Sequence, residues 1–299
     1  CALFPGGADC ALAQTVKHSV WDGLTLFDTI FPLFLFIAGV SFPFSYAKQV
    51  ASNMSRGKIY MKILRRAVIL IFLGLVYNDF FKLDFENLRF CSVLGRIGIA
   101  WSLAALLFIN FSTKTRIVIS SVILVGYWLL ICYVPAPDVV GALPLSKEGN
   151  LVGYVDRMIT PGRLIYGTFD PEGLLSALPA VVTAMLGMFT GEFVRRNDII
   201  EQKKAGYMGL ASIALLAVGL VWSLVFPVNK ALWSSSFVLV VGSYSLAMFA
   251  LFYYVIDVRG YQKWATPFVV IGLNSITIYM AQRIIPFKSI SAFFLQGFA

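Results

Sequence analysis

Residues 17–42, KHSVWDGLTLFDTIFPLFLFIAGVSF, begin with a polar stretch and continue as a long apolar run. A helix of about 20 mostly apolar residues crosses a hydrocarbon core about 30 Å thick, and the run from Leu24 onward is long enough to do so. The stretch also contains the chain's only histidine, His18, and an aspartate inside the apolar run, Asp28. A carboxylate at membrane depth costs about 2.5–3.5 kcal/mol on insertion, so Asp28 must face a polar partner or a water-filled cavity.

Apolar runs of the same kind recur along the chain. Hydrophobic residues make up 59% of the 299 residues and charged residues 13%, whereas soluble domains average about 45–50% and about 25%. The period-two alternation of a membrane barrel is absent. The sequence therefore predicts an all-α, polytopic helical bundle of an integral membrane protein. We expect about eight spans, at approximately 24–45, 66–81, 95–111, 116–134, 172–192, 207–226, 233–256 and 266–286.

The connections between these spans differ in charge from one side to the other. Four connections, 48–66, 112–116, 193–205 and 257–264, carry 14 of the 24 basic residues, and only four acidic residues lie in or next to them. The rest of the chain carries 10 basic and 11 acidic residues. By the positive-inside rule the basic connections lie in the cytoplasm, so His18 and the segments 82–94, 135–171 and 227–232 lie on the other side. The net charge of +9 thus reflects topology, and we expect no nucleic-acid partner.

The range 1–299 is interpreted as a single transmembrane domain. Its one substantial extramembrane piece is 135–171, which is too short for a domain and long enough for a lid or a docking surface. At the end of this piece, the residues DPEGLLSALP place Asp170 and Glu172 at the start of a helix, where the helix dipole favours carboxylates. These two residues are either helix caps or substrate-binding residues.

The four cysteines, Cys1, Cys10, Cys91 and Cys132, show no metal-ligand spacing. With a single histidine in the chain an ordinary zinc site cannot be assembled, so we expect no metal. Cys91 and Cys132 are expected to pack against their neighbours. Cys1 and Cys10 either pair as a disulfide outside the cytoplasm or stay as separate thiols.

Further polar residues lie at the edges of the spans or inside them. They are Asn78 and Asp79 at the outer end of the second span, Arg89 and Arg96 before and at the start of the third, Asn229 and Lys230 before the seventh, and Asn274 inside the last. Arg89 and Arg96 are seven residues apart and share one face if that stretch is a continuous helix. Each residue has a structural alternative, because arginines at the edge of a span snorkel to the interface and asparagines bridge helices.

The pair of His18 and Asp28 indicates general-base chemistry. An imidazole with an ordinary pKa of about 6.5 accepts a proton from an amine or hydroxyl at neutral pH, and a carboxylate on its other nitrogen fixes its tautomer. The sequence leaves three partners for Asp28, which are His18, Arg89 and Arg96. No G-x-S-x-G motif and no Walker-type phosphate loop is present, which argues against a serine hydrolase and a P-loop enzyme.

Residues 18–45, HSVWDGLTLFDTIFPLFLFIAGVSFPFS, resemble the signature H-x-x-W-[DN]-G-[LC]-T…D-x-[IV]-F-P-x-F-[LV]-F-I-x-G of the heparan-alpha-glucosaminide N-acetyltransferase family. Three further stretches resemble the same family in the same order: LRFCSVLGRIGIAW (88–101), DPEGLLSALPAVVTAMLG (170–187) and FPVNKALWSSSFVL (226–239). A weaker fifth is PFVVIGLNSITIYM (267–280). The resemblance covers nearly the whole chain from about residue 18, and it implies another span before residue 1 and more after residue 299.

The resemblance implies a transmembrane enzyme that moves an acetyl group from cytosolic acetyl-CoA to the amino group of a terminal glucosamine on the other side. His18 corresponds to the family's catalytic histidine and Asp28 to the aspartate of the same motif. Substrate-binding roles are expected for Trp21, Asp22, Arg89, Arg96, Asp170, Glu172, Asn229, Lys230 and Asn274. The large extracytoplasmic domain of the lysosomal enzyme is not seen in this sequence, so the acceptor is either an amino sugar or a glycan hydroxyl.

In the expected mechanism acetyl-CoA enters from the cytoplasm, attracted by the 48–66 connection, and the acceptor binds beside 135–171. His18 takes the proton as the acceptor attacks the thioester, while Arg96, Asn274 or a helix terminus steadies the oxyanion. An acetyl-histidine relay is the alternative route. A function of another class, a proton-coupled transporter of a small solute, would use His18, Asp28 and Asp79 as a proton relay. The compact chain favours a bacterial inner membrane, and a homodimer is one possible assembly.

Overall fold

The computed structural model describes residues 17–287, 289, 290 and 293, and within this part the regular structure is helical. Cys1 and Cys10 lie outside the described residues. The helices are α2 (Leu26–Ala51), α3 (Arg56–Tyr77), α4 (Val93–Asn110), α5 (Thr113–Tyr133), α6 (Leu151–Ile159), α7 (Ala177–Val194), α8 (Glu201–Ser223), α9 (Ser235–Tyr253), α10 (Thr266–Leu273) and α11 (Ser275–Ile284). Short turns of other helix types are Phe80–Lys82, Tyr254–Val258 and Lys263–Ala265.

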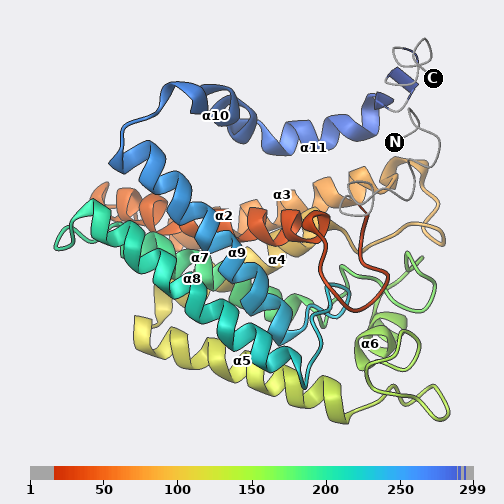
Figure 1. The fold of residues 1–299 in the computed structure, drawn as a ribbon. Helices are drawn as coiled ribbons and strands as arrows, with labels where there is room; N and C mark the ends of the chain where they lie inside the picture. Colours follow the sequence, from red (N-terminus) through yellow and green to blue (C-terminus); the bar gives the residue numbers. More distant parts are fainter. Residues whose placement is uncertain (1–16, 288, 291–292, 294–299) are drawn as a thin grey trace.

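The long helices lie side by side, with their connections gathered at two ends of the bundle (Figure 1). The connections that follow α2, α4, α7 and α9 lie at one end, and these are the four basic connections. Residues 17–25, the segment around α6 and the turn between α8 and α9 lie at the opposite end. The all-α, polytopic fold predicted from the hydropathy pattern is confirmed, because apolar runs that satisfy their own backbone hydrogen bonds form helices in a bilayer.

Six helical segments are long and apolar enough to cross a membrane, namely α2, α4, α5, α7, α8 and Ser235–Val258. The pair Lys263–Leu273 and Ser275–Ile284 passes the same test together and is bent by 61°, which gives seven if it counts as one span. The predicted second span, 66–81, covers the second half of α3 and the turn after it, and α3 has basic residues along its first half, among them Lys62, Arg65 and Arg66. The expected number of about eight spans is therefore six or seven by length and composition in the described part of the chain.

Helix α2 packs along α7 through small residues. A Cβ atom added to Gly187 would lie 2.0 Å from the carbonyl oxygen of Phe36, and one added to Gly39 would lie 2.2 Å from that of Ala184. The two backbones approach so closely only because neither position carries a side chain, which is typical of helix pairs in membranes. This contact fixes α2, whose first turn carries Asp28, against the most buried helix of the bundle.

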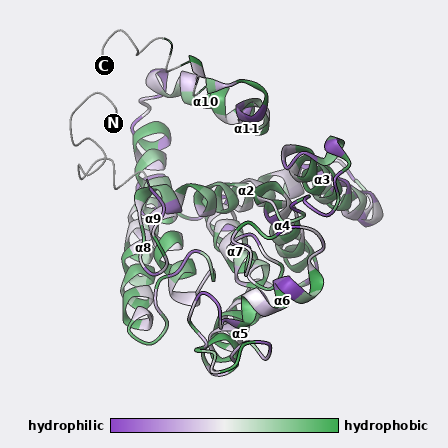
Figure 2. Ribbon diagram, turned by 90° about the vertical axis from the view of Figure 1, so that its right-hand side faces the viewer, coloured by the Kyte–Doolittle hydropathy of each residue, from purple (hydrophilic) through white to green (hydrophobic). Residues whose placement is uncertain are grey.

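The short helices α10 and α11 lie at the edge of the bundle in both views (Figures 1 and 2). Asn274 is at the bend between them. The start of the bent pair is strongly apolar, with Phe268 and Leu273 among its exposed side chains. Helix α11 contacts the end of α3, where Tyr279 stacks on Tyr77 with ring centroids 4.7 Å apart and Arg283 binds Asp79.

Candidate active site

Asp28 is the third residue of α2, and its carboxylate folds back over the start of the helix. The backbone N–H and the hydroxyl of Thr25 donate to Asp28 Oδ2 at 3.2 and 2.9 Å, and the backbone N–H of Ser19 donates to the same oxygen at 3.1 Å. A carboxylate at this position also interacts favourably with the helix dipole. Asp28 is completely buried. Three donors therefore fix Oδ2 and leave Oδ1 to accept from other groups.

His18 and Lys230 both meet Asp28 at Oδ1. His18 Nδ1 is 2.6 Å from Oδ1, and Lys230 Nζ is 3.2 Å from Oδ1 and 3.1 Å from His18 Nδ1. An ionised carboxylate only accepts hydrogen bonds, so the short contact requires a proton on Nδ1 of the imidazole. Lysine nitrogen only donates, so the partner of Lys230 is the carboxylate, and its closeness to Nδ1 follows from both groups meeting one oxygen.

This arrangement leaves Nε2 of His18 without a hydrogen-bond partner among the described residues. The His18 side chain is 49% exposed, and the ring lies edge-on to Phe27 at a centroid distance of 4.6 Å. A half-exposed imidazole with one nitrogen held by a buried carboxylate is arranged to accept a proton at the other nitrogen. Of the three partners that the sequence left for Asp28, the structure places His18 on it, together with Lys230.

The turn between α8 and α9 brings Lys230 to this place. Asn229 is buried; its amide donates to Asp22 Oδ1 at 3.0 Å, and its side-chain oxygen accepts from the backbone N–H of Leu232 at 2.9 Å. The backbone N–H of Gly23, at a φ of +113° that favours glycine, donates to the carbonyl of Val228 at 2.8 Å. The segment before α2 and the turn before α9 are thus joined directly.

Trp21 joins the same segment to the extramembrane piece predicted at 135–171. Its indole N–H donates to the carbonyl of Leu145 at 2.9 Å, and its ring lies edge-on to Phe169 at 5.3 Å. Lys147 lies above the ring at 5.9 Å. Trp21 and Asp22 therefore hold the ends of three segments together around His18.

Arg89 and Arg96 form a second cluster with the residues before α7. Arg89 binds both oxygens of Asp170, at 2.7 Å from Nε and 2.6 Å from Nη2, and also binds Glu172. Arg96 Nη2 donates to the carbonyl of Gly173 at 3.0 Å and to the hydroxyl of Ser176. Arg89 precedes α4, which begins at Val93, so the two arginines do not share one helix face; they meet the same segment from different elements.

The same segment explains why α7 begins at Ala177, later than the predicted span. Asp156 of α6 accepts the backbone N–H groups of Asp170 at 3.2 Å and Leu174 at 3.1 Å. A Cβ atom on Gly173 would lie 2.2 Å from the Asp156 carboxylate. Residues 170–176 are thus bound as turns against α6, and Asp170 accepts the Arg89 guanidinium as well as the backbone N–H of Glu172.

Burial and pairing move the pKa values of these carboxyl groups in opposite directions. Burial raises the pKa of Asp156 to about 6, an effect only partly offset by its two backbone donors. Burial would also raise the pKa of Asp170, but the hydrogen bonds and charge of Arg89 outweigh it and lower that pKa. Asp156 was not among the predicted residues, and no signal in the sequence marks it, because it lies in a short helix of a loop segment.

Arg96 is the one of these residues that keeps unused donors. Its side chain is 2% exposed, and its Nε and Nη1 have no hydrogen-bond partner among the described residues. Its guanidinium carbon lies 4.9 Å from the ring centroid of the buried Trp233, which itself lies edge-on to Phe31 at 5.0 Å. Among the described residues Arg96 makes no hydrogen bond to His18, Asp28 or Lys230, so it belongs to the second cluster and to the packing around Trp233.

Three other polar residues lie elsewhere. Asn274 is exposed at the bend before α11, and its amide donates to the carbonyl of Val270 at 2.9 Å, so it is not part of either cluster. Asn78 donates to the carbonyls of Arg89 and Cys91 at 2.8 and 2.9 Å and fixes the entry to α4. Asp79 binds Lys82 and Arg283. In the described part of the chain, no three histidine, cysteine or acidic residues are grouped as metal ligands.

Comparison with known proteins shows what the chain is similar to. No family model matches the chain. Heparan-alpha-glucosaminide N-acetyltransferase of Homo sapiens is 29% identical over 325 aligned positions, which cover 90% of this chain and 48% of the human protein. The mouse protein of the same name is 28% identical over 90% of this chain and 49% of its own length. The chain spans about half the length of these curated relatives. Its similarity to heparan-alpha-glucosaminide N-acetyltransferases thus extends over nine tenths of the sequence, which confirms the resemblance indicated by the motifs.

Proposed function

We propose that this chain is a membrane acetyltransferase that moves the acetyl group of acetyl-CoA to an amino sugar on the non-cytoplasmic side, with His18 as the general base. The observation that carries the proposal is the 2.6 Å contact between His18 Nδ1 and the buried Asp28 carboxylate. This contact leaves Nε2 free at a half-exposed ring. The similarity to two curated acetyltransferases supports the reaction class.

The direction of transfer follows from the charge of the two ends. The four basic connections lie at the end of the bundle opposite His18, where they would attract the phosphates of acetyl-CoA. The acyl group would then approach His18 from within the bundle, while the acceptor binds from the other side. Trp21, Asp22 and Asn229 contact one another or neighbouring segments, so we assign them to holding the acceptor side in shape. We assign the same structural role to the ion pairs of Arg89 with Asp170 and Glu172.

The chemical step is a direct transfer. The acceptor nitrogen attacks the thioester carbonyl carbon, and His18 Nε2 takes the proton that the nitrogen loses. Asp28 stabilises the imidazolium that forms. When the tetrahedral intermediate collapses, the carbon–sulfur bond breaks, and the leaving thiolate takes the proton from His18. Arg96 has unused, buried N–H groups, but among the described residues it makes no hydrogen bond to His18, Asp28 or Lys230, so we do not assign it as the donor to the negative oxygen.

Replacement of His18 by Ala tests the proposal. We expect transfer of labelled acetyl from acetyl-CoA to glucosamine to fall by about 10²–10⁴-fold, because a positioned general base contributes this much. The variant should retain its thermal stability in detergent and its stabilisation by acetyl-CoA. Asp138→Ala, an exposed carboxylate at the same end, is the matched control and should transfer normally. Unchanged turnover in the His18 variant would end the proposal.

Kinetics separate direct transfer from an acetyl-histidine relay. A direct step requires both substrates on the enzyme together, so double-reciprocal plots of initial rate should intersect. A relay would release CoA before the acceptor reacts and give parallel lines. Stabilisation by acetyl-CoA separates the enzyme from a proton-coupled transporter, which has no reason to bind that thioester.

A further inference from the structure

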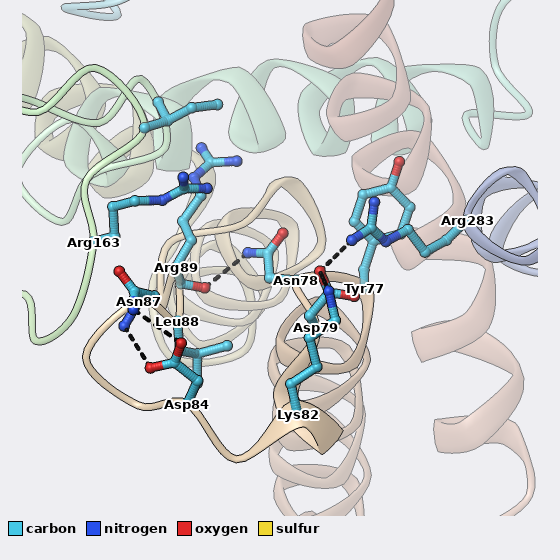
Figure 3. A pocket seen from close by; sticks show the side chains of 11 residues that line it. Tyr77, Asn78, Asp79, Lys82, Asp84, Asn87, Leu88, Arg89, Arg163 and Arg283 are labelled. Atoms are coloured by element: carbon cyan, nitrogen blue, oxygen red, sulfur yellow. Dashed lines mark hydrogen bonds and ion pairs between the residues drawn. The ribbon is translucent and has the colours of Figure 1, made fainter.

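A cavity of about 360 Å³ lies at the outer end of α3 (Figure 3), and its lining includes none of His18, Asp28 and Lys230. Its walls come from four parts of the chain that are distant in sequence: the end of α3, the loop before α4, residues 163–165, and α11. Its charged lining residues are Asp79, Lys82, Asp84, Arg89, Arg163 and Arg283. In Figure 3, Arg163 and Arg283 enter from opposite sides, with Arg89 and Asn78 between them.

The lining carries more positive than negative charge, with four cations and two carboxylates. Asp79 is shared by two cations, Lys82 at 3.1 Å and Arg283. Asp84 accepts from the side chain and the backbone of Asn87 at 2.9 and 3.2 Å. Asp79 thus binds two cations, whereas Asp84 accepts hydrogen bonds from Asn87.

Arg163 supplies a further cation without a partner. Its backbone N–H donates to the carbonyl of Leu88 at 3.0 Å, but its guanidinium makes no hydrogen bond or ion pair with the described residues. Arg89 is different, because Asp170 and Glu172 already balance its charge from outside the cavity. Without Arg89 the lining has three cations and two carboxylates, so one positive charge remains, and Arg163 is the cation that no carboxylate of the described residues binds.

The surroundings place this cavity at the level of lipid head groups. The aromatic pair of Tyr77 and Tyr279 lies at the end of α3, and tyrosines are typical of the membrane–water interface. On the loop that lines the cavity, Phe81, Leu83 and Phe85 are 70%, 67% and 53% exposed. Large apolar side chains exposed beside a polar loop are expected to enter the interface. At this level the commonest anion in a membrane is phosphate.

We infer that this cavity binds a phosphate group. Guanidinium groups match the oxygens of a phosphate with paired N–H donors, and a lysine adds a point charge. The volume suits a small polar ligand or head group. The phosphate comes either from a lipid that contacts the exposed apolar loop or from a free ion in solution. This inference is independent of acetyl transfer, because binding at this cavity requires no reaction at His18.

Ligand-dependent thermal stability of the full chain tests the inference. The delipidated protein in an uncharged detergent is titrated with dioctanoylphosphatidylglycerol in one arm and with inorganic phosphate in the other. Arg163→Gln should weaken binding about tenfold, since one charge-assisted hydrogen bond is lost. Arg163 is exposed, so the variant should fold. Arg259→Gln, an exposed arginine at the other end, is the matched control and should bind as the parent does.

The two arms distinguish the sources of phosphate. Stabilisation by the lipid alone, lost in Arg163→Gln, assigns the cavity to a head group. Stabilisation by inorganic phosphate as well, with the same loss, assigns it to the phosphate group itself. No stabilisation in either arm, or equal weakening in Arg163→Gln and Arg259→Gln, would overturn the inference. His18→Ala should bind both probes normally, so failure here is distinct from failure of the proposed acetyl transfer.

Discussion

Two clusters at the same end of the bundle are each built around a buried carboxylate, and they differ in what they leave open. In the His18 cluster, Asp28 holds an imidazole that is 49% exposed and has a free nitrogen. In the Arg89 cluster, Asp170 is completely buried under an arginine whose side chain is 14% exposed. The first cluster leaves an imidazole partly open to the outside, whereas the charged groups of the second are bound to one another.

This difference distinguishes residues with a proposed catalytic role from residues with a structural role, although both kinds are charged residues near a span in the sequence. A charged residue near a membrane span indicates function by default, and both clusters satisfied that rule. Only the geometry shows that Arg89, Asp170 and Glu172 neutralise one another. Such a group shapes the site and fixes the start of α7, whereas His18 can exchange a proton.

Asp28→Asn is the strongest test of the reactive cluster. The amide keeps the size of the side chain but removes the charge that stabilises the imidazolium, so we expect kcat to fall about 10³-fold or more. Labelled acetyl transfer measures the loss. Asp138→Asn, which changes an exposed carboxylate paired with Arg157, is the control and should leave kcat unchanged. Equal rates for the two variants would remove Asp28 from the mechanism.

Arg89→Met tests the closed cluster. The variant leaves Asp170 and Glu172 without their cation, and loss of one partner of a buried ion pair costs about 3–5 kcal/mol of folding stability. Thermal unfolding in detergent measures the cost. Arg196→Met breaks the exposed pair with Asp198 and should cost much less, because solvent screens an exposed ion pair. If the two variants were equally stable, the second cluster would not be structural.

Asp156→Asn tests how the closed cluster responds to pH. The raised pKa means that the folded chain binds this proton more tightly than the unfolded chain, whose pKa is taken as 3.8. The contribution of Asp156 to stability is therefore full below about pH 4 and is lost as pH rises through about 6. The difference in the free energy of unfolding between the parent and the variant should change by about 3 kcal/mol over this pH window and stay constant above it. If the free energies of unfolding of the parent and the variant changed in parallel from pH 4 to pH 8, the prediction for Asp156 would be wrong.

Much of the fold could be predicted from the sequence, because the apolar runs decide which segments become helices. Every predicted span falls mainly on helical residues, although 66–81 continues from α3 into a turn and 266–286 is divided between α10 and α11, which are bent by 61°. The basic residues of α3 make it too polar to pass as a span by composition. The late start of α7 could not be predicted, since it depends on the backbone hydrogen bonds that Asp156 accepts. Hydropathy does not report such contacts.

The candidate site was predictable in part. His18 and Asp28 stood out because a lone imidazole and a carboxylate beside an apolar run are rare and costly. Asn274 stood out for the same reason, yet it lies at an exposed bend away from both clusters. Its position depends on how the bent pair of α10 and α11 lies against the bundle, which local sequence does not encode.

The sequence by itself determined the membrane character of the chain, its helices, the charge difference between its ends and the presence of His18 near Asp28. These properties depend on residues close together in the chain. Only the tertiary structure decided which polar groups meet. Lys230 reaches Asp28 across 202 residues, and Arg89 reaches Asp170 across 81, because packed helices bring their ends together. A buried charge must find a partner, but which partner it finds is fixed by the packing of the whole bundle.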